Sequence, residues 1–338
     1  MDHAGRLFTY ANAESGFVTS RKWPVTIKSP KYATREQIDY ISRQYEAMDR
    51  AITSNDGFDE DGHYYTDFID LHSFVTYFLC QEVLMNHDGG LGSVTVFKPE
   101  DEVSTKFHAG PVWDFDVAFH LGANALNYLP NAYVILDGIK GCPDGYSGLL
   151  GEVAKHEDFM DSVKVIYRQQ MKPVLDKYLF SVIFDNKRKK IEKDAMFNAY
   201  LWNKNVKSYS DDCNALVHFM KERIDYIDND WIYNSYDYTI TLDVNWAEAP
   251  LPYHIVTMRV KDGEVLSNFP IKVAHYCYDY NSYNGMGWYD SKTGNKFDPT
   301  QPIKSNMTLV YKWELISGMK KIYKETKNKL IQFVKSFM

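Results

Sequence analysis

Two aspartates, Asp114 and Asp116, stand two residues apart in the apolar segment GPVWDFDVAFH, residues 110–120. Their β-branched and aromatic neighbours predict a strand, in which residues i and i+2 face the same side. Two adjacent carboxylates repel each other, and burying them among aromatic rings is costly unless a cation or hydrogen bonds compensate. A divalent cation beside both carboxylates would remove this cost, so the pair predicts a metal site.

Three earlier residues complete an order that suits phosphoryl transfer. Lys28 ends the predicted strand VTIK, Glu46 follows on a predicted helix, and Asp88 lies in the Gly-rich turn NHDGG after an apolar helix. In protein kinases a strand lysine holds the ATP phosphates and a helix glutamate orients that lysine. A loop aspartate then takes the proton of the acceptor hydroxyl, and a later aspartate binds magnesium. This order predicts Lys28 and Glu46 as ATP-binding residues, Asp88 as the catalytic residue, and Asp114 and Asp116 as ligands of Mg²⁺ or Mn²⁺.

Other interpretations of the same residues stay open. The carboxylates could form a glycosidase pair, which would explain the aromatic neighbours but not the order of the lysine and the other acids. Lys28 could be a solvated residue at a strand end, Glu46 a surface residue of its helix, and Asp88 the first residue of an Asx turn before Gly89. Magnesium-dependent ATP binding would separate an active kinase from an inert binding protein.

The elements that must position these residues follow from capping and periodicity. Thr34 and Gln37 form a capping box that predicts a helix over residues 34–52, with one apolar face. A second helix, starting near Asp70 and reaching residue 88, is apolar almost all round and is therefore expected to be buried. Residues 22–30, 93–99 and 106–119 predict strands, and residues 7–13 predict another near the start of the chain.

The hydrophobic periodicity changes from helical to strand-like near Tyr236. Residues 149–178, 187–202 and 210–231 predict helices, whereas 236–246, 253–263, 271–280 and 307–313 alternate like strands. We therefore expect an α+β fold with a helix-rich domain over residues 1–235 and a β-rich domain over residues 237–313. Residues 314–338 predict a basic amphipathic helix that could contact an anionic membrane or a partner, or could pack back on its own domain.

Composition narrows the function classes. A net charge of −7 over 338 residues provides no general basic field, so nucleic acid is not expected as a partner. The four cysteines form no CxxC motif, which argues against a structural zinc site. No transmembrane segment and no signal peptide are predicted. The chain begins almost inside a strand, so we expect further residues upstream.

Residues 8–232 resemble the CotH kinases. The resemblance is carried by VTIKSP followed by TREQIDYI, by the helix DLHSFVTYFLCQEVLMNHD, by SVTVFK and by GPVWDFDVAF. It implies an atypical protein-kinase-like fold that uses ATP and magnesium to phosphorylate a hydroxyl group on a protein substrate or cell-envelope partner. By position, Asp88 would be the catalytic-loop aspartate and Asp114 or Asp116 the metal ligand. The strands expected before Lys28 are cut short, which leaves open whether this chain is an active enzyme or an inert surface-binding protein.

The C-terminal domain resembles a second family. The segment MGWYDSKTGNKFDPTQPIKSNMTLVYKW is similar to the end of an internalin B-type, or Listeria–Bacteroides, repeat, through Gly287, Trp288, Gly294, Phe297 and Trp313. This resemblance covers residues 237–313 and implies a small β-grasp-like module. Both resemblances together imply a protein that is secreted or lies at the cell surface of a bacterium.

Overall fold

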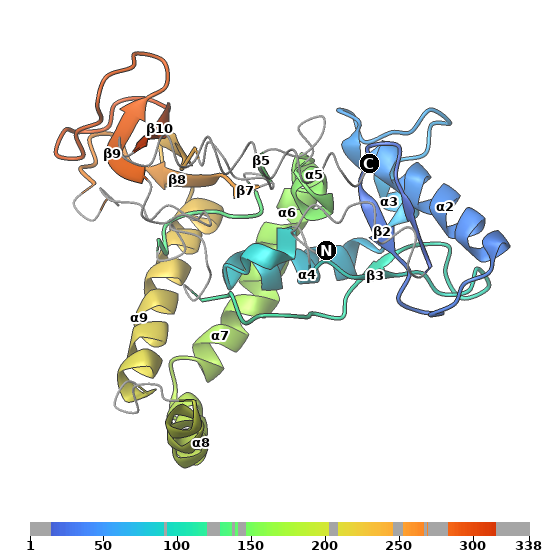
Figure 1. The fold of residues 1–338 in the computed structure, drawn as a ribbon, viewed down its shortest axis with the longest axis horizontal. Helices are drawn as coiled ribbons and strands as arrows, with labels where there is room; N and C mark the ends of the chain where they lie inside the picture. The colour runs from blue at the N-terminus through green and yellow to red at the C-terminus, as the bar shows by residue number, and fades with distance from the viewer. Residues whose placement is uncertain are drawn as a thin grey trace, which may run out of the picture. The chain divides into compact units, whose positions relative to one another are not determined.

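The computed structural model describes residues 15–90, 93–119, 129–136, 139–140, 147–202, 209–245, 253–266, 269 and 283–315. The chain divides into two compact units, with the main boundary between Tyr236 and Asp237 (Figure 1). The first unit also takes in residues 253–255. Within the described ranges, every helix is too short or too polar to cross a membrane.

The first unit begins with a hairpin and a capped helix. β1 (Gly16–Val18) pairs antiparallel with β2 (Pro24–Thr26), and α2 (Arg35–Thr53) follows. The predicted capping box is present: the Thr34 side chain accepts a hydrogen bond from the Gln37 N–H, and the Gln37 side chain accepts one from the Thr34 N–H. The apolar face of α2 buries Tyr45, Met48 and Ile52, which places the helix against the interior.

The predicted apolar helix is α4 (Leu71–Val83), and it forms the centre of this unit. The Asp70 carboxylate accepts a hydrogen bond from the Ser73 N–H at 2.8 Å and so caps the helix start. Eight of the thirteen residues of α4 are buried, as its all-round hydrophobicity predicts. Before it lies the short α3 (Tyr65–Phe68), and after it a 3₁₀ turn, η2 (His87–Gly90). The hairpin of β3 (Val96–Phe97) and β4 (His108–Ala109) packs beside α4.

Most of the other elements of the first unit are helices. They are α5 (Leu149–Val153), α6 (Glu157–Ile166), α7 (Lys172–Tyr178), α8 (Val182–Leu201) and α9 (Tyr209–Ile227), with π-helical turns η4 (Tyr167–Met171) and η6 (Asp228–Ile232). The predicted single helix over residues 149–178 is interrupted after Val153. At this break His156 Nε2 lies 2.8 Å from the Ile52 carbonyl oxygen, so a tertiary contact with the end of α2 replaces helix continuation. A short pair, β5 (Ile139–Lys140) with β7 (Tyr253–His254), also belongs to this unit.

The second unit is built on a four-stranded sheet. Its strands are β6 (Tyr238–Asp243), β8 (Val256–Val260), β9 (Tyr283–Asp290) and β10 (Met307–Leu315), in the order β8-β6-β10-β9. The two central strands, β6 and β10, run parallel, and both outer pairs are antiparallel. The predicted helix over residues 314–338 is wrong at its start, because Glu314 and Leu315 extend β10 by pairing with β9. Residues 316–338 and the predicted strand at 271–280 lie outside the described residues.

Candidate functional site

Three of the predicted site residues meet in space. Asp88 lies in η2, after α4, and Asp114 and Asp116 lie in the segment after β4. One carboxylate oxygen of each lies within 4.8 Å of the other two. Asp88 is partly buried, and Asp114 and Asp116 are exposed. Because Mg²⁺ prefers one or two carboxylates together with phosphate oxygens and water, these acids fit a divalent cation shared with a phosphorylated ligand.

The segment that carries Asp114 and Asp116 is a turn, and the predicted strand over residues 106–119 is wrong beyond Ala109. Asp114 has a φ of +62°, which is incompatible with an extended strand, and residues 116–119 form a turn. Val112 and Trp113 are 53% and 61% exposed. The two aspartates are therefore not buried among aromatic rings as expected, and water solvates part of their charge.

Asn86, which the sequence analysis did not single out, joins the two parts of the carboxylate cluster. Its side chain is fully buried and donates hydrogen bonds to the Asp114 carbonyl oxygen at 3.0 Å and to Gln81 Oε1 at 2.8 Å. Its Oδ1 accepts a hydrogen bond from the Asp88 N–H at 3.3 Å. One side chain thus connects α4, η2 and the Asp114 turn. The signal in the sequence was an amide two residues before the aspartate, which is the spacing of an Asx turn.

Ser93 supplies a second connection. Its N–H donates to the Asp88 carbonyl oxygen at 3.0 Å, and its hydroxyl lies 3.4 Å from Asp114 Oδ2, to which it donates. The Tyr77 hydroxyl of α4 donates to the Ser93 carbonyl oxygen at 2.7 Å. Ser93 is 6% exposed. These bonds hold the chain after Asp88 against both α4 and Asp114.

Gly89 is required by the close packing of η2 on α4. A Cβ atom at this position would lie 2.3 Å from Gln81 Oε1, closer than two heavy atoms can approach without moving. Gln81 is itself fully buried and bonded to Asn86. The turn after Asp88 therefore approaches the helix only because residue 89 has no side chain.

Lys28 and Glu46 do not join one another in the structure. Lys28 is exposed and lies beyond the end of β2, and the Glu46 carboxylate instead accepts hydrogen bonds from the Ser20 N–H at 2.6 Å and the Ser20 hydroxyl at 2.8 Å. Among the residues described, no ion pair links Lys28 to Glu46. The cation that binds α2 is Arg21, which pairs with the buried Asp49 at 3.3 Å. The turn of the β1–β2 hairpin, and not the end of β2, lies over this helix.

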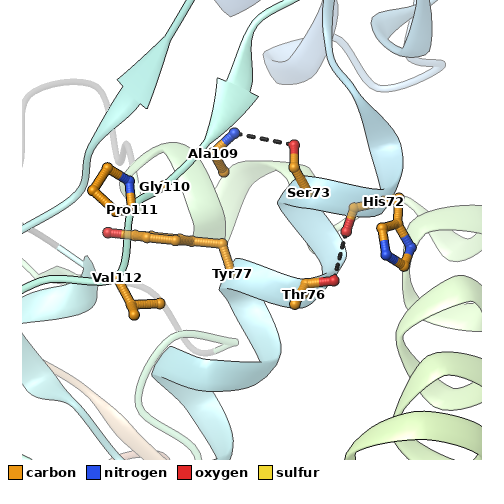
Figure 2. Close-up of a pocket in the computed structure, with 8 residues that line it drawn as sticks. All are labelled: His72, Ser73, Thr76, Tyr77, Ala109, Gly110, Pro111 and Val112. Atoms are coloured by element: carbon orange, nitrogen blue, oxygen red, sulfur yellow. Dashed lines mark hydrogen bonds between the residues drawn. The ribbon is translucent and has the colours of Figure 1, made fainter.

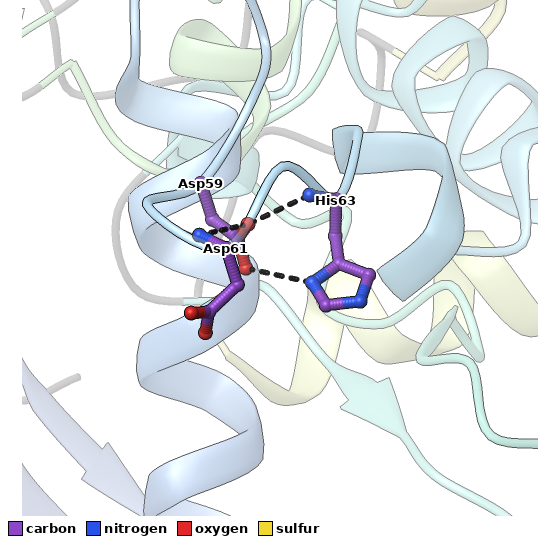
Figure 3. A group of neighbouring side chains, drawn as sticks. All are labelled: Asp59, Asp61 and His63. Atoms are coloured by element: carbon purple, nitrogen blue, oxygen red, sulfur yellow. Dashed lines mark hydrogen bonds and ion pairs between the residues drawn. The ribbon is translucent and has the colours of Figure 1, made fainter.

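A second acidic group, Asp59, Asp61 and His63, also has ligand-type atoms within 4.8 Å of one another. Figure 3 shows that Asp59 organises this turn: its Oδ1 accepts from the N–H groups of Asp61 at 3.0 Å and His63 at 2.8 Å. His63 Nδ1 lies 3.4 Å from Asp59 Oδ2. Desolvation works to raise the pKa of Asp59, but these donors and His63 hold it below its ordinary value. The carboxylate is used inside its own turn, so we assign no ligand to this group.

A shallow cavity of about 270 Å³ lies between α4 and the segment after β4 (Figure 2). Its hydroxyl groups are already engaged: Ser73 Oγ accepts from the Ala109 N–H at 3.1 Å, and Thr76 Oγ1 donates to the His72 carbonyl oxygen at 2.8 Å. Its lining residues are His72, Ser73, Thr76, Tyr77, Ala109, Gly110, Pro111 and Val112. None of the three clustered aspartates lines it, so the cavity and the carboxylate cluster are separate features.

Comparison with known proteins gives one match. The sequence model of the family described as CotH kinase protein matches residues 2–227, about two thirds of the chain. No curated protein and no solved structure matches the chain. The matched range includes all the predicted site residues, from Lys28 to Asp116.

Proposed function

Because the chain belongs to the CotH kinase protein family, we propose that its kinase-like domain transfers phosphate from ATP to a hydroxyl group of a protein acceptor. The observation that carries this proposal is the convergence of Asp88, Asp114 and Asp116 within 4.8 Å. These residues come from two separate segments, and their order along the chain is that of the acceptor base and the metal ligand in protein kinases.

Each acid of the cluster has a proposed role. Asp114 and Asp116 hold Mg²⁺ or Mn²⁺, which when bound would neutralise charge on the ATP phosphates. Asp88 accepts the proton of the acceptor hydroxyl, because its oxygen lies close enough to the metal ligands for acceptor and phosphate to meet at one point. Ser93 follows Asp88 at the spacing of the second metal-binding residue in the kinase catalytic loop, and its hydroxyl already contacts Asp114.

The proposed binding of the ATP phosphates involves the N-terminal part of the first unit. Lys28 is proposed to contact them through its exposed ammonium group. Glu46 is proposed to act by holding the hairpin turn at Ser20, in place of pairing directly with Lys28. Both roles rest on the order of the two residues along the chain and on the bonds between Glu46 and Ser20.

A second candidate function is an inert, pseudokinase-like domain of a surface-binding or adhesion protein. The observation that favours it is the commitment of Glu46 to Ser20, which leaves the lysine–glutamate pair of active kinases unformed. In this alternative the carboxylate cluster binds metal or nucleotide without transfer.

The second unit supports placement at the bacterial cell surface. Its first and last strands, β6 and β10, lie side by side and parallel at the centre of the sheet. This order is that of a β-grasp-like module, and with the residues quoted above it supports the proposal of an internalin B-type repeat. We propose that the protein is secreted or attached to the envelope and that its acceptor is a protein in that compartment.

The test compares nucleotide binding with phosphate transfer in single variants of the full chain. We expect Mg²⁺ and ATP together to raise the melting temperature, and Asp114→Asn and Asp116→Asn to reduce this shift. Asp88→Asn should keep the shift and lower the rate of phosphate transfer by roughly 10²–10⁴-fold. Asp61→Asn, in the second acidic group, is the matched control.

Three results separate the alternatives. A metal-dependent shift with no transfer to any protein acceptor would support the inert domain. A shift that is unchanged in both Asp114→Asn and Asp116→Asn would place the metal elsewhere and contradict the proposed site. Loss of the shift in Asp61→Asn would move the metal site to the Asp59 turn.

A further inference from the structure

Helix α8 has an unusual environment for a helix of its length. It packs on α7 and α9, and lies beyond the end of α7, away from α4 (Figure 1). None of its 20 residues is buried. Its exposed large apolar residues, with Trp202 just after its end, are Val182, Ile191, Met196, Phe197, Tyr200, Leu201 and Trp202. So large an apolar surface in one place normally marks a binding surface.

The outward side of α8 combines five of these apolar residues with lysines, whereas Ile191 and Met196 lie outside it. Residues at helical spacing along this side are Val182, Asn186, Lys189, Lys190, Lys193, Phe197, Tyr200 and Leu201, and all of them are exposed. We call these residues, with Trp202, the basic–aromatic face. Positions spaced by three or four residues share one side of a helix, and this row contains no acid.

The opposite side of α8 forms an ion pair within the helix and hydrogen bonds to α9. Arg188 pairs with Asp185 at 3.2 Å and donates to Asn214 Oδ1 of α9 at 2.8 Å. The Tyr209 hydroxyl of α9 donates to the Arg188 carbonyl oxygen at 2.9 Å. The partly covered residues of α8 are Ile183, Phe184, Arg188, Ala195 and Ala199, and Arg188 carries the polar contacts to α9. The basic–aromatic face lies on the other side of the helix, with Lys189 at its edge, where it lines a small pocket with Tyr209.

We propose that the basic–aromatic face binds the surface of an anionic lipid membrane. The lysines occupy the middle of the face, after Val182 and Asn186, and Phe197, Tyr200, Leu201 and Trp202 occupy its end. An interfacial helix lies in the plane of the membrane with its apolar side buried by about 5–10 Å. In this orientation the aromatic residues lie at the boundary between headgroups and acyl chains, and Lys189, Lys190 and Lys193 contact the lipid phosphates.

Residue types favour a membrane over a protein partner. Lysine is depleted in protein–protein interfaces, where arginine is preferred, and α8 presents lysines on its outward side. Tyrosine and tryptophan are enriched at the membrane–water interface, and exposed lysines there bind anionic headgroups.

The test measures binding of the full chain to phosphatidylcholine vesicles with and without phosphatidylglycerol. We expect binding only to the anionic vesicles, weakened by added salt. The triple variant Lys189→Gln, Lys190→Gln, Lys193→Gln should bind roughly 100-fold more weakly, since each lysine near such a surface contributes about fivefold. The matched control removes three other exposed lysines, Lys22, Lys31 and Lys292, by the same substitution and should keep most of the binding.

A second measurement tests insertion and does not depend on charge. Trp202 fluorescence, obtained as the difference between the wild-type protein and Trp202→Phe, should be quenched by lipids brominated in their acyl chains. Circular dichroism of each variant checks that the helices are retained. These readouts are independent of phosphate transfer, so they remain valid if the proposed kinase activity is not found.

Several outcomes would overturn the proposal. Equal vesicle binding by the triple lysine variant and its control would place the membrane contact elsewhere, with residues 316–338 the next region to test. Binding to polyglutamate but not to anionic vesicles would identify an acidic protein as the partner. Self-association that is lost in the triple variant, without vesicle binding, would identify a second copy of the chain.

Discussion

Glu82 and Asp88 lie close together in the sequence, on either side of the end of α4, and their carboxylates have opposite surroundings. Glu82 is fully buried and pairs with the equally buried Arg223 at 2.8 Å. The same carboxylate accepts hydrogen bonds from three consecutive backbone N–H groups, those of Val134, Ile135 and Leu136. Arg223 also donates to backbone carbonyl oxygens, among them Glu82 at 2.7 Å and Pro130 at 3.1 Å.

Asp88, in contrast to Glu82, lies in a cluster of acids near the surface. It is partly buried and lies beside Asp114 and Asp116, both exposed, with one carboxylate oxygen of each acid within 4.8 Å of the other two. The contrast shows how one protein uses carboxylates in two ways. A buried acid that is surrounded by hydrogen-bond donors connects distant segments of the chain. Acids that lie close together at the surface repel one another and can bind a cation from solution.

Substituting Glu82 should cause the largest loss of stability among the variants compared. Glu82→Gln leaves the buried Arg223 charge without its counter-ion and places an amide group against backbone donors. We expect a loss of roughly 3–5 kcal/mol in the free energy of unfolding. Urea unfolding followed by circular dichroism measures it, with the exposed Glu102→Gln as control. The double variant Glu82→Gln, Arg223→Met should recover part of the loss; no recovery would mean that the pair does not act as a unit.

Substituting Asn86 should have an intermediate effect. Asn86→Ala removes the partners of the Asp88 N–H and the Asp114 carbonyl oxygen, and leaving buried polar groups unpaired costs about 1–3 kcal/mol. The same change should weaken the magnesium-dependent rise in melting temperature, because both acidic segments lose their shared support. Asn55→Ala, at an exposed position, is the control. If stability falls while the magnesium response is untouched, Asn86 supports the fold but does not position the cluster.

Neutralising the cluster should change stability only slightly when no metal is present. We expect Asp114→Asn and Asp116→Asn, measured with a chelator, to differ from the wild-type protein by no more than about 0.5 kcal/mol. The direction should be toward higher stability, because like charges are removed. A large loss would show that these acids stabilise the fold as Glu82 does, and it would remove the contrast between the two environments.

The smallest effect should be on the pH dependence of stability that comes from Asp70. The surroundings of this carboxyl are intermediate between those of Glu82 and those of the carboxylate cluster. Desolvation works to raise the pKa of this N-cap carboxyl, but the Ser73 N–H and hydroxyl, with nearby His108, hold it below its ordinary value of 3.8. A lowered folded-state pKa means that its stabilisation is present above the unfolded-state pKa and is lost as pH falls through the folded-state pKa. Asp70→Asn, which retains a capping side chain, should flatten stability against pH below about 4. An unchanged slope would assign the acid sensitivity to other carboxyls.

Local features of the sequence were sufficient for the helices beside Asp88, but not for the segment of Asp114 and Asp116, which was predicted as a strand and is irregular. The capping box at Thr34 and Gln37, the start of α4 at Asp70 and the burial of α4 all agree with the sequence prediction, because each depends on residues within a few positions of one another. The start of α8 was predicted five residues too late. Its cap is Ser181, whose hydroxyl accepts from the Ile183 N–H, and the sequence analysis did not consider it.

Contacts between distant segments could not be predicted in the same way. The order of Lys28 and Glu46 suggested a pair, but Glu46 bonds to Ser20, and Arg21 pairs with Asp49. The reason is that the hairpin turn brings residues 19–22 over α2 and carries Lys28 past it. Which cation reaches a helix depends on where a turn ends, and a difference of a few residues changes the partner.

The amino-acid sequence alone determined which acids this protein could use and the helix and turn that carry Asp88, since capping, periodicity and turn chemistry act over a few residues. Only the tertiary structure decided that Glu82 is buried against Arg223, which lies far along the chain, while Asp114 and Asp116 reach the surface. A carboxylate is the same group in both places, and its role depends on the donors that folding brings around it. Those donors come from residues whose distance in sequence carries no information about their distance in space.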